Sequence, residues 1–113
     1  MDSFPEEHDL LALLGEPELT DPGIPWAYNR LTFRPSSGNR SGEVVIEPGE
    51  GNVELRLAAE GSEVVSVALH DAAAVEIDVT RDHEELVVTL ARDGVVRLRV
   101  RPTLHLFWST AAP

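Results

Sequence analysis

The sequence lacks the residue types on which several kinds of functional site depend. It has no cysteine, which excludes disulfides, thiolate zinc sites and a cysteine nucleophile. Lysine is also missing, so neither a Schiff-base lysine nor a P-loop lysine is available. No apolar run approaches the roughly 18 residues of a membrane span, and the acidic N-terminus lacks the basic start of a signal peptide. These absences predict a cytoplasmic protein with no membrane partner and no cofactor.

The charge balance is strongly acidic, with a formal net charge of −11 at pH 7. Such a field repels nucleic-acid phosphates and attracts basic proteins, although it also serves solubility alone. We therefore expect no nucleic-acid partner, and a basic protein is the partner that the charge favours. The 113 residues fit a single domain, 1–113, with a core large enough to fold without disulfides.

Short runs of alternating apolar and polar residues fill the chain from Val44 to Trp108, as in Val53–Leu57 and Val96–Val100. A period of two places one set of side chains on a buried face, and turn signals at intervals of roughly 8–12 residues are typical of antiparallel β domains. The predicted strands are 27–34, 43–47, 52–59, 63–70, 74–80, 84–91, 95–101 and 103–109. Whether 103–109 is a separate strand or continues 95–101 past Pro102 stays open at this point.

One helix is predicted over residues 4–14. Ser3 and Glu6 have the spacing of a capping box, and Gly15 is a typical residue just beyond a helix end. So short a helix is marginal alone, so its leucines need an apolar surface to cover. We expect a mainly β (α+β) fold, in which about seven or eight strands form an antiparallel meander over 27–109. The sheet is curved or barrel-like with the helix capping one end, and the alternatives are a sandwich or a homodimer through a sheet face or edge strand.

The alternation also predicts strand registers, because a one-residue slip turns every side chain to the opposite face. The predicted pairs include Leu57 with Val65, Leu90 with Val96, Val79 with Leu86 and Glu85 with Arg101. Gly94 is placed at the left-handed position of a turn over 92–94. The core predicted from these registers is Leu55, Leu57, Val65, Val67, Ile77, Val79, Leu86, Val88, Leu98 and Val100.

The segment 25–30 is the best candidate contact surface, because tryptophan and tyrosine are favoured at binding hot spots. The candidate partner-contact residues there are Trp26, Tyr28 and Arg30. Weaker candidates are Arg97, Arg99, Arg101, His70 and His105, and the arginines have cross-strand carboxylates as their structural explanation. No two histidines have a short ligand spacing, and no Gly-x-Ser-x-Gly elbow occurs, so neither a metal site nor a catalytic site is predicted.

These observations favour a small acidic, non-enzymatic accessory or interaction protein of bacterial type. A specific version is an immunity- or antitoxin-like protein that neutralises a basic partner such as a nuclease. One alternative is a small-ligand-binding, barrel-like protein, which would need polar groups pointing inward. An enzyme of unknown chemistry is the other alternative.

Overall fold

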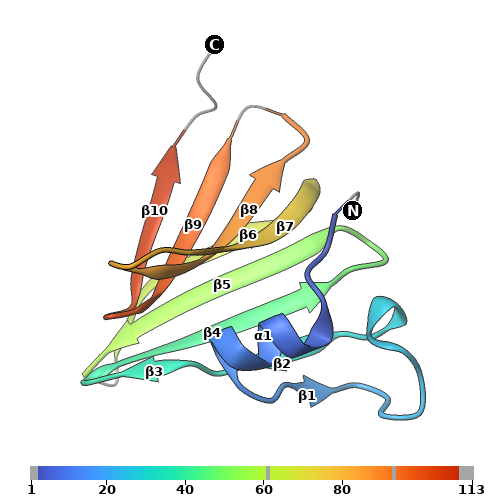
Figure 1. Ribbon diagram of the computed structural model, residues 1–113, viewed down its shortest axis with the longest axis horizontal. Helices are drawn as coiled ribbons and strands as arrows, with labels where there is room; N and C mark the ends of the chain where they lie inside the picture. Colours follow the sequence, from blue (N-terminus) through green and yellow to red (C-terminus); the bar gives the residue numbers. More distant parts are fainter. Residues whose placement is uncertain (1–2, 61, 93, 110–113) are drawn as a thin grey trace.

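Two antiparallel sheets and one α-helix build the part of the chain that the computed structural model describes, residues 3–60, 62–92 and 94–109 (Figure 1). The strand order is β1-β2-β4-β5-β6 in the first sheet, where β3 also pairs with β4, and β10-β9-β8-β7 in the second. The predicted mainly β fold with an antiparallel meander is therefore confirmed. It consists of two curved sheets and not of a closed barrel.

The element bounds follow the chain order. The first sheet contains β1 (Glu18–Leu19), β2 (Leu31–Phe33), β3 (Ser36–Ser37), β4 (Arg40–Glu47), β5 (Asn52–Ala59) and β6 (Ser62–Leu69). The second contains β7 (Ala72–Val79), β8 (Glu84–Leu90), β9 (Val95–Arg101) and β10 (His105–Ser109). The helix is α1 (Glu7–Leu14), and a short 3₁₀ turn, η1, spans Trp26–Tyr28. The last run is thus a separate strand, because β10 pairs antiparallel with β9.

Helix α1 begins at Glu7, so the predicted start at residue 4 is wrong, and no side chain caps it. Ser3, the predicted cap, instead forms a parallel bridge with Ala74 of β7, and its carbonyl accepts a hydrogen bond from the amide of Val75 at 2.8 Å. The helix ends as predicted: Gly15 has a φ of 84°. A positive φ at this position favours glycine, which carries no Cβ.

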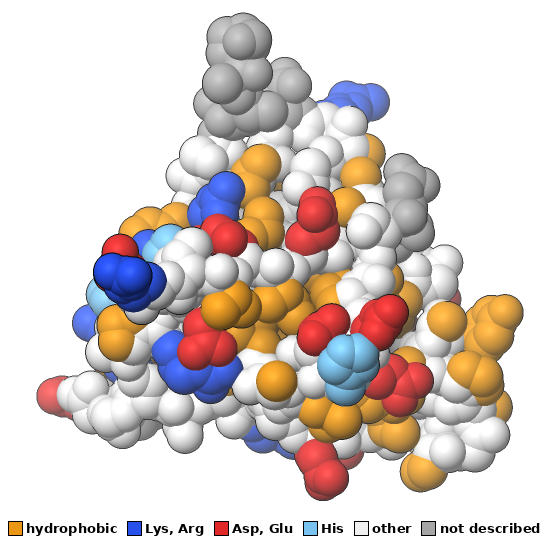
Figure 2. All heavy atoms as spheres, in the orientation of Figure 1, with side chains coloured by type: hydrophobic (Ala, Val, Ile, Leu, Met, Phe, Trp, Pro, Cys, Tyr) orange, Lys and Arg blue, Asp and Glu red, His pale blue; other side chains and the backbone are white. Residues whose placement is uncertain are grey.

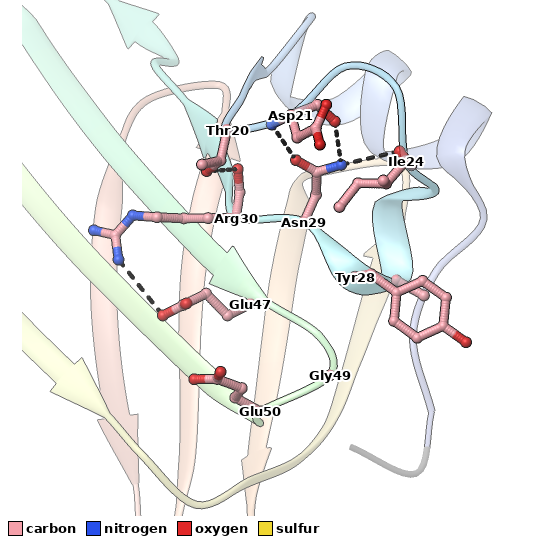
Figure 3. A pocket seen from close by; sticks show the side chains of 10 residues that line it. Thr20, Asp21, Ile24, Tyr28, Asn29, Arg30, Glu47, Gly49 and Glu50 are labelled. Carbon is pink, nitrogen blue, oxygen red and sulfur yellow. Dashed lines mark hydrogen bonds and ion pairs between the residues drawn. The ribbon is translucent and has the colours of Figure 1, made fainter.

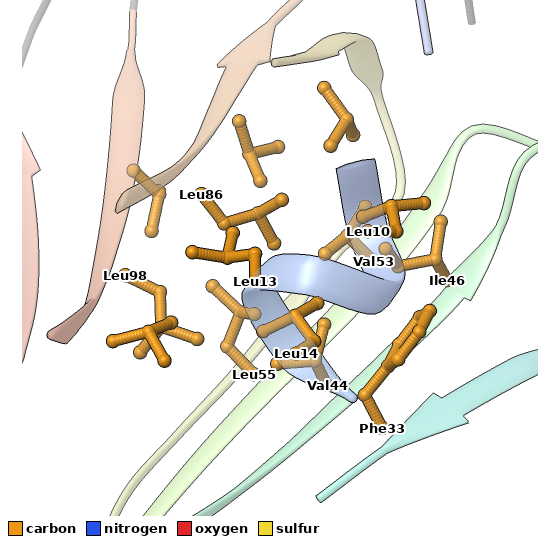
Figure 4. Close-up of a cluster of buried hydrophobic side chains, with 14 of the residues drawn as sticks. Leu10, Leu13, Leu14, Phe33, Val44, Ile46, Val53, Leu55, Leu86 and Leu98 are labelled. Atoms are coloured by element: carbon orange, nitrogen blue, oxygen red, sulfur yellow. The ribbon is translucent and has the colours of Figure 1, made fainter. Parts of the chain in front are cut away.

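The core lies between the helix and the two sheets (Figure 4). Leu10, Leu13 and Leu14 of α1 join buried side chains from both sheets in one cluster. The other members include Phe33, Val44, Ile46, Val53, Leu55, Val75, Leu86, Val88, Val96, Leu98, Val100 and Leu104. Half of the predicted core is fully buried there, whereas Val79 is 63% exposed, so its prediction is wrong.

The registers explain which core predictions failed. Leu57 lies opposite Val65, as predicted. In β8–β9, Val88 lies opposite Val96, and in β7–β8, Val79 lies opposite Glu84. Both of these registers differ from the predicted ones by two residues. An even shift keeps the same faces buried but moves Val79 to the end of its ladder, beyond the core.

The turn predicted over 92–94 includes Asp93, which lies outside the described residues. Gly94 itself is closely packed, since a Cβ there would lie 2.9 Å from Leu90 Cδ1. Within the described residues, no helix is long and apolar enough to cross a membrane.

Candidate partner-binding site

The segment before β2 is a short 3₁₀ turn, so the prediction of a strand from residue 27 is wrong for its first half. The cause is Asn29, which is 4% exposed. Its Nδ2 donates to the carbonyls of Asp21 at 2.8 Å and Ile24 at 3.0 Å, and its Oδ1 accepts from the Asp21 amide at 2.9 Å (Figure 3). Side-chain bonds of this kind compete with a strand ladder. They fix the loop over 21–25, and Asn29 was not among the predicted site residues.

Tyr28 is the most exposed large apolar side chain among the described residues, at 77%. Its ring points away from the loop (Figure 3), and its backbone amide donates to Pro25 at 3.0 Å. Ile24 lies in the same loop and is 38% exposed. A tyrosine held outward by a fixed turn offers contact area at little cost in conformational entropy. Ile24, Trp26 and Tyr28 are called the aromatic corner below.

Trp26 and Tyr28 do not share one face, contrary to the prediction. Trp26 is half-buried and packs edge-on against Phe33, with ring centroids 6.2 Å apart and an interplanar angle of 70°. In a 3₁₀ turn, neighbouring side chains diverge by about 120°, since three residues complete one turn. One aromatic ring therefore anchors the corner in the core, while the other faces solvent.

Two hollows flank η1, and Ala27 lines both of them. The hollow on the Tyr28 side has a volume of about 480 Å³ and includes Asp21 and Glu50 in its lining. The hollow on the Trp26 side has a volume of about 420 Å³. The aromatic corner is therefore a ridge between two depressions.

Arg30, the third predicted contact residue, lies beside the Tyr28 hollow. Its Nη1 is 3.5 Å from Glu47 Oε1 and its Nη2 is 3.7 Å from Glu54 Oε2. The guanidinium thus already faces two carboxylates of the first sheet. Arg30 therefore links the segment that follows the aromatic corner to β4 and β5.

The weaker arginine candidates form a charge network on the second sheet. Glu85 is 2% exposed, and its carboxylate accepts from Arg97 at 3.3 Å and from Arg99 at 2.9 Å. Arg101 donates to both oxygens of Glu84, at 2.6 and 2.9 Å. These bonds hold the pKa of Glu84 below its ordinary value and raise the pKa of Arg101. The predicted cross-strand pairing of arginines with carboxylates is present, although Glu85 lies opposite Arg99 and not opposite Arg101.

Asp78, His83 and Glu85 bring three ligand-type atoms within 4.8 Å of one another. His83 Nε2 is buried and lies 3.5 Å from Asp78 Oδ2 and from Glu85 Oε1, without a hydrogen bond. The same two oxygens face Arg97 Nη1, at 3.7 and 3.3 Å. Arg97 therefore already supplies the positive charge that a metal ion would bring, and the group has a structural explanation.

The structure does not bring His70 and His105 together. His70 is exposed just after β6, with Nδ1 3.4 Å from Asn52 Oδ1. His105 begins β10 on the other sheet, where its Nδ1 lies 3.2 Å from Arg40 Nη1. Neither histidine therefore forms part of a shared ligand set with the other.

The architecture of two curved antiparallel sheets with one packed helix also occurs in a known protein structure. No protein-family model matches the chain, and no curated protein matches it. Among solved structures, it is similar to a chain of a "Contact-dependent growth inhibition toxin - immunity protein complex from Klebsiella pneumoniae 342". The TM-score is 0.80 over 97% of each chain, and the sequences are 12% identical. At this identity, the likeness shows a shared fold.

Proposed function

We propose that this chain is a small non-enzymatic interaction protein of the immunity type, which binds a basic protein through its aromatic corner. The observation that carries the proposal is Tyr28, 77% exposed on a turn that Asn29 holds in place. Large aromatic side chains on a rigid support are typical binding anchors. The similarity to a chain from a toxin–immunity complex supports a protein partner.

The basic nature of the partner rests on charge. A net charge of −11 accelerates the approach of a cationic protein and slows that of an anionic one. The same charge opposes self-association, so it disfavours the alternative of a homodimer. The form of the ligand-binding alternative that uses a barrel interior is disfavoured, because buried leucine, valine and phenylalanine side chains occupy the space between helix and sheets.

The test uses the protein encoded by the gene adjacent to that of this chain. We expect its expression to arrest bacterial growth and co-expression of this chain to restore growth. With both proteins purified, Tyr28→Ala should raise the Kd at least about 30-fold, as removal of a hot-spot side chain does. The melting temperature should stay the same, because the Tyr28 side chain is mostly in solvent.

Val64→Ala is the matched control for this experiment. Val64 lies on β6 and is 67% exposed, so its truncation also removes exposed apolar surface. We expect its Kd to equal that of the unaltered chain. Equal binding by Tyr28→Ala and the unaltered chain would show that the aromatic corner is not the contact surface.

A further inference from the structure

The hollow on the Trp26 side lies between two segments that are distant in sequence. Phe4 and Pro5 of the N-terminal segment line one part of it, and Trp26 and Ala27 of η1 line another. Phe4 and Trp26 both pack against the buried core, which fixes their apolar surfaces at the base of this groove. The groove is therefore lined in part by two aromatic side chains that the core holds in place.

The same groove carries carboxylates at its rim. Glu6 and Glu7 line it, and both are exposed. Among the described residues, Glu6 has an ion pair only with His8, at 3.4 Å, and Glu7 has none. Figure 2 shows acidic side chains gathered around a histidine where α1 begins. A cation that enters the groove would meet two carboxylates and an aromatic ring.

Several carboxylates on the sheets, unlike the two at this rim, are paired with arginines. On the first sheet, Arg34 and Arg56 face Glu43 at 3.7 and 3.5 Å. On the second sheet, Glu84 and Glu85 are bonded to arginines. Glu43, Glu84 and Glu85 thus have guanidinium partners within the chain, whereas Glu6 and Glu7 line a groove whose lining contains His8 but no arginine.

We infer that the groove between the N-terminal segment and η1 receives an arginine side chain of the partner. Its guanidinium would stack on Trp26 and bond the carboxylates of Glu6 and Glu7, while its methylene stem covers Phe4. Guanidinium groups combine these two contacts because they are planar, weakly hydrated and rich in donors. The inference rests on the proposed function, and it names the chemistry of one contact in that interface.

A fluorescence titration tests the groove without the partner. Trp108→Phe leaves Trp26 as the single tryptophan, since the chain has two. A tetra-arginine peptide is the probe, and a tetra-citrulline peptide is its uncharged equivalent. We expect a saturable change in Trp26 emission with tetra-arginine, weakened by salt, and none with tetra-citrulline. Equal responses to both peptides, or no saturable response to tetra-arginine, would overturn the inference.

Two charge-neutralised variants in the same background locate the effect. Glu6→Gln/Glu7→Gln should weaken tetra-arginine binding by about fivefold, because two exposed ion pairs are lost. The control Glu60→Gln/Glu63→Gln removes the same charge where β5 turns into β6, outside the groove lining. It should bind tetra-arginine as the Trp108→Phe protein does. Melting curves confirm that both variants fold. Equal weakening by both variants would mean that net charge, and not the groove, attracts the peptide.

The purified partner separates this inference from the proposed function. If Tyr28→Ala weakens partner binding while Glu6→Gln/Glu7→Gln does not, the aromatic corner is the interface and the groove inference is wrong. If tetra-arginine binds the groove while the adjacent gene product does not bind the chain, the groove is a guanidinium site and the proposed function is wrong.

Discussion

The outer face of the second sheet and the aromatic corner use charge in opposite ways. On the sheet, Arg97 and Arg99 converge on the buried carboxylate of Glu85. At the corner, Glu6 and Glu7 border an apolar groove and face solvent. Charges that neutralise one another within the chain fix strand register. Charges left at the rim of an exposed aromatic ridge are available to another molecule.

Burial decides how much each region contributes to stability. Removing one member of a buried ion pair leaves an uncompensated charge, whereas exposed pairs contribute little. The sheet network should therefore respond to mutation through unfolding, and the corner through binding. Three predictions test this contrast, in descending order of expected effect on stability.

The largest effect is expected at Glu85. Glu85→Ala leaves Arg97 and Arg99 without their shared carboxylate and opens space at a position that is 2% exposed. We expect a loss of about 2–3 kcal/mol in the free energy of unfolding, measured by urea denaturation, because bonds to a charged group are lost while both arginines stay partly hydrated. Glu76→Ala, on the exposed part of β7, is the control and should change it by less than about 0.5 kcal/mol. A loss at Glu85 as small as the control's would mean that the network does not hold the sheet.

An intermediate effect is expected at Asn29. Asn29→Ala removes three short hydrogen bonds to the loop and leaves the carbonyls of Asp21 and Ile24 without that donor. Because such groups are costly when left unsatisfied, we expect a loss of about 1–3 kcal/mol and weaker partner binding as the corner loosens. Asn39→Ala, at an exposed position, is the matched control, and calorimetry measures both variants. Unchanged partner binding by Asn29→Ala would show that recognition of the partner does not depend on the rigidity of this loop.

The smallest effect is expected at Glu84, and it depends on pH. Bonds from Arg101 hold the pKa of Glu84 below its ordinary value of 4.5 in the folded chain. Stability from this pair is therefore present above that value and is lost as the pH falls through the lowered pKa. The difference in melting temperature between the unaltered chain and Glu84→Gln should be largest at neutral pH and vanish in acid. If the difference in melting temperature stayed constant in acid, the ion pair between Glu84 and Arg101 would not be its cause.

Local alternation was sufficient to predict most strands. The strands predicted over 52–59 and 95–101 have those bounds in the structure. Alternation gives the face of each residue but not the absolute register, so Leu90 was predicted opposite Val96, whereas Val88 lies there. A two-sheet sandwich was an alternative, but the division at residues 70–71 was not predicted, since a turn between two alternating runs has the same pattern whether or not the strands pair.

The candidate site was predictable only in its residue types. Trp26 and Tyr28 were identified by their chemistry, but their opposite orientations depend on the bonds of Asn29 to residues five and eight positions earlier. The groove depends on Phe4 and Trp26, which are distant in sequence but line the same depression. Periodicity carries no information about such contacts, because it describes neighbours along one element.

The bridge between Ser3 and Ala74 has a consequence for the behaviour of the protein in concentrated solution. β7 is the last strand of its sheet, and an uncovered strand edge can pair with another molecule and begin aggregation. The carbonyl of Ser3 accepts a hydrogen bond from the amide of Val75 on that edge. Ser3 therefore covers part of the β7 edge, and a chain shortened past Ser3 would expose an aggregation-prone edge while retaining its core.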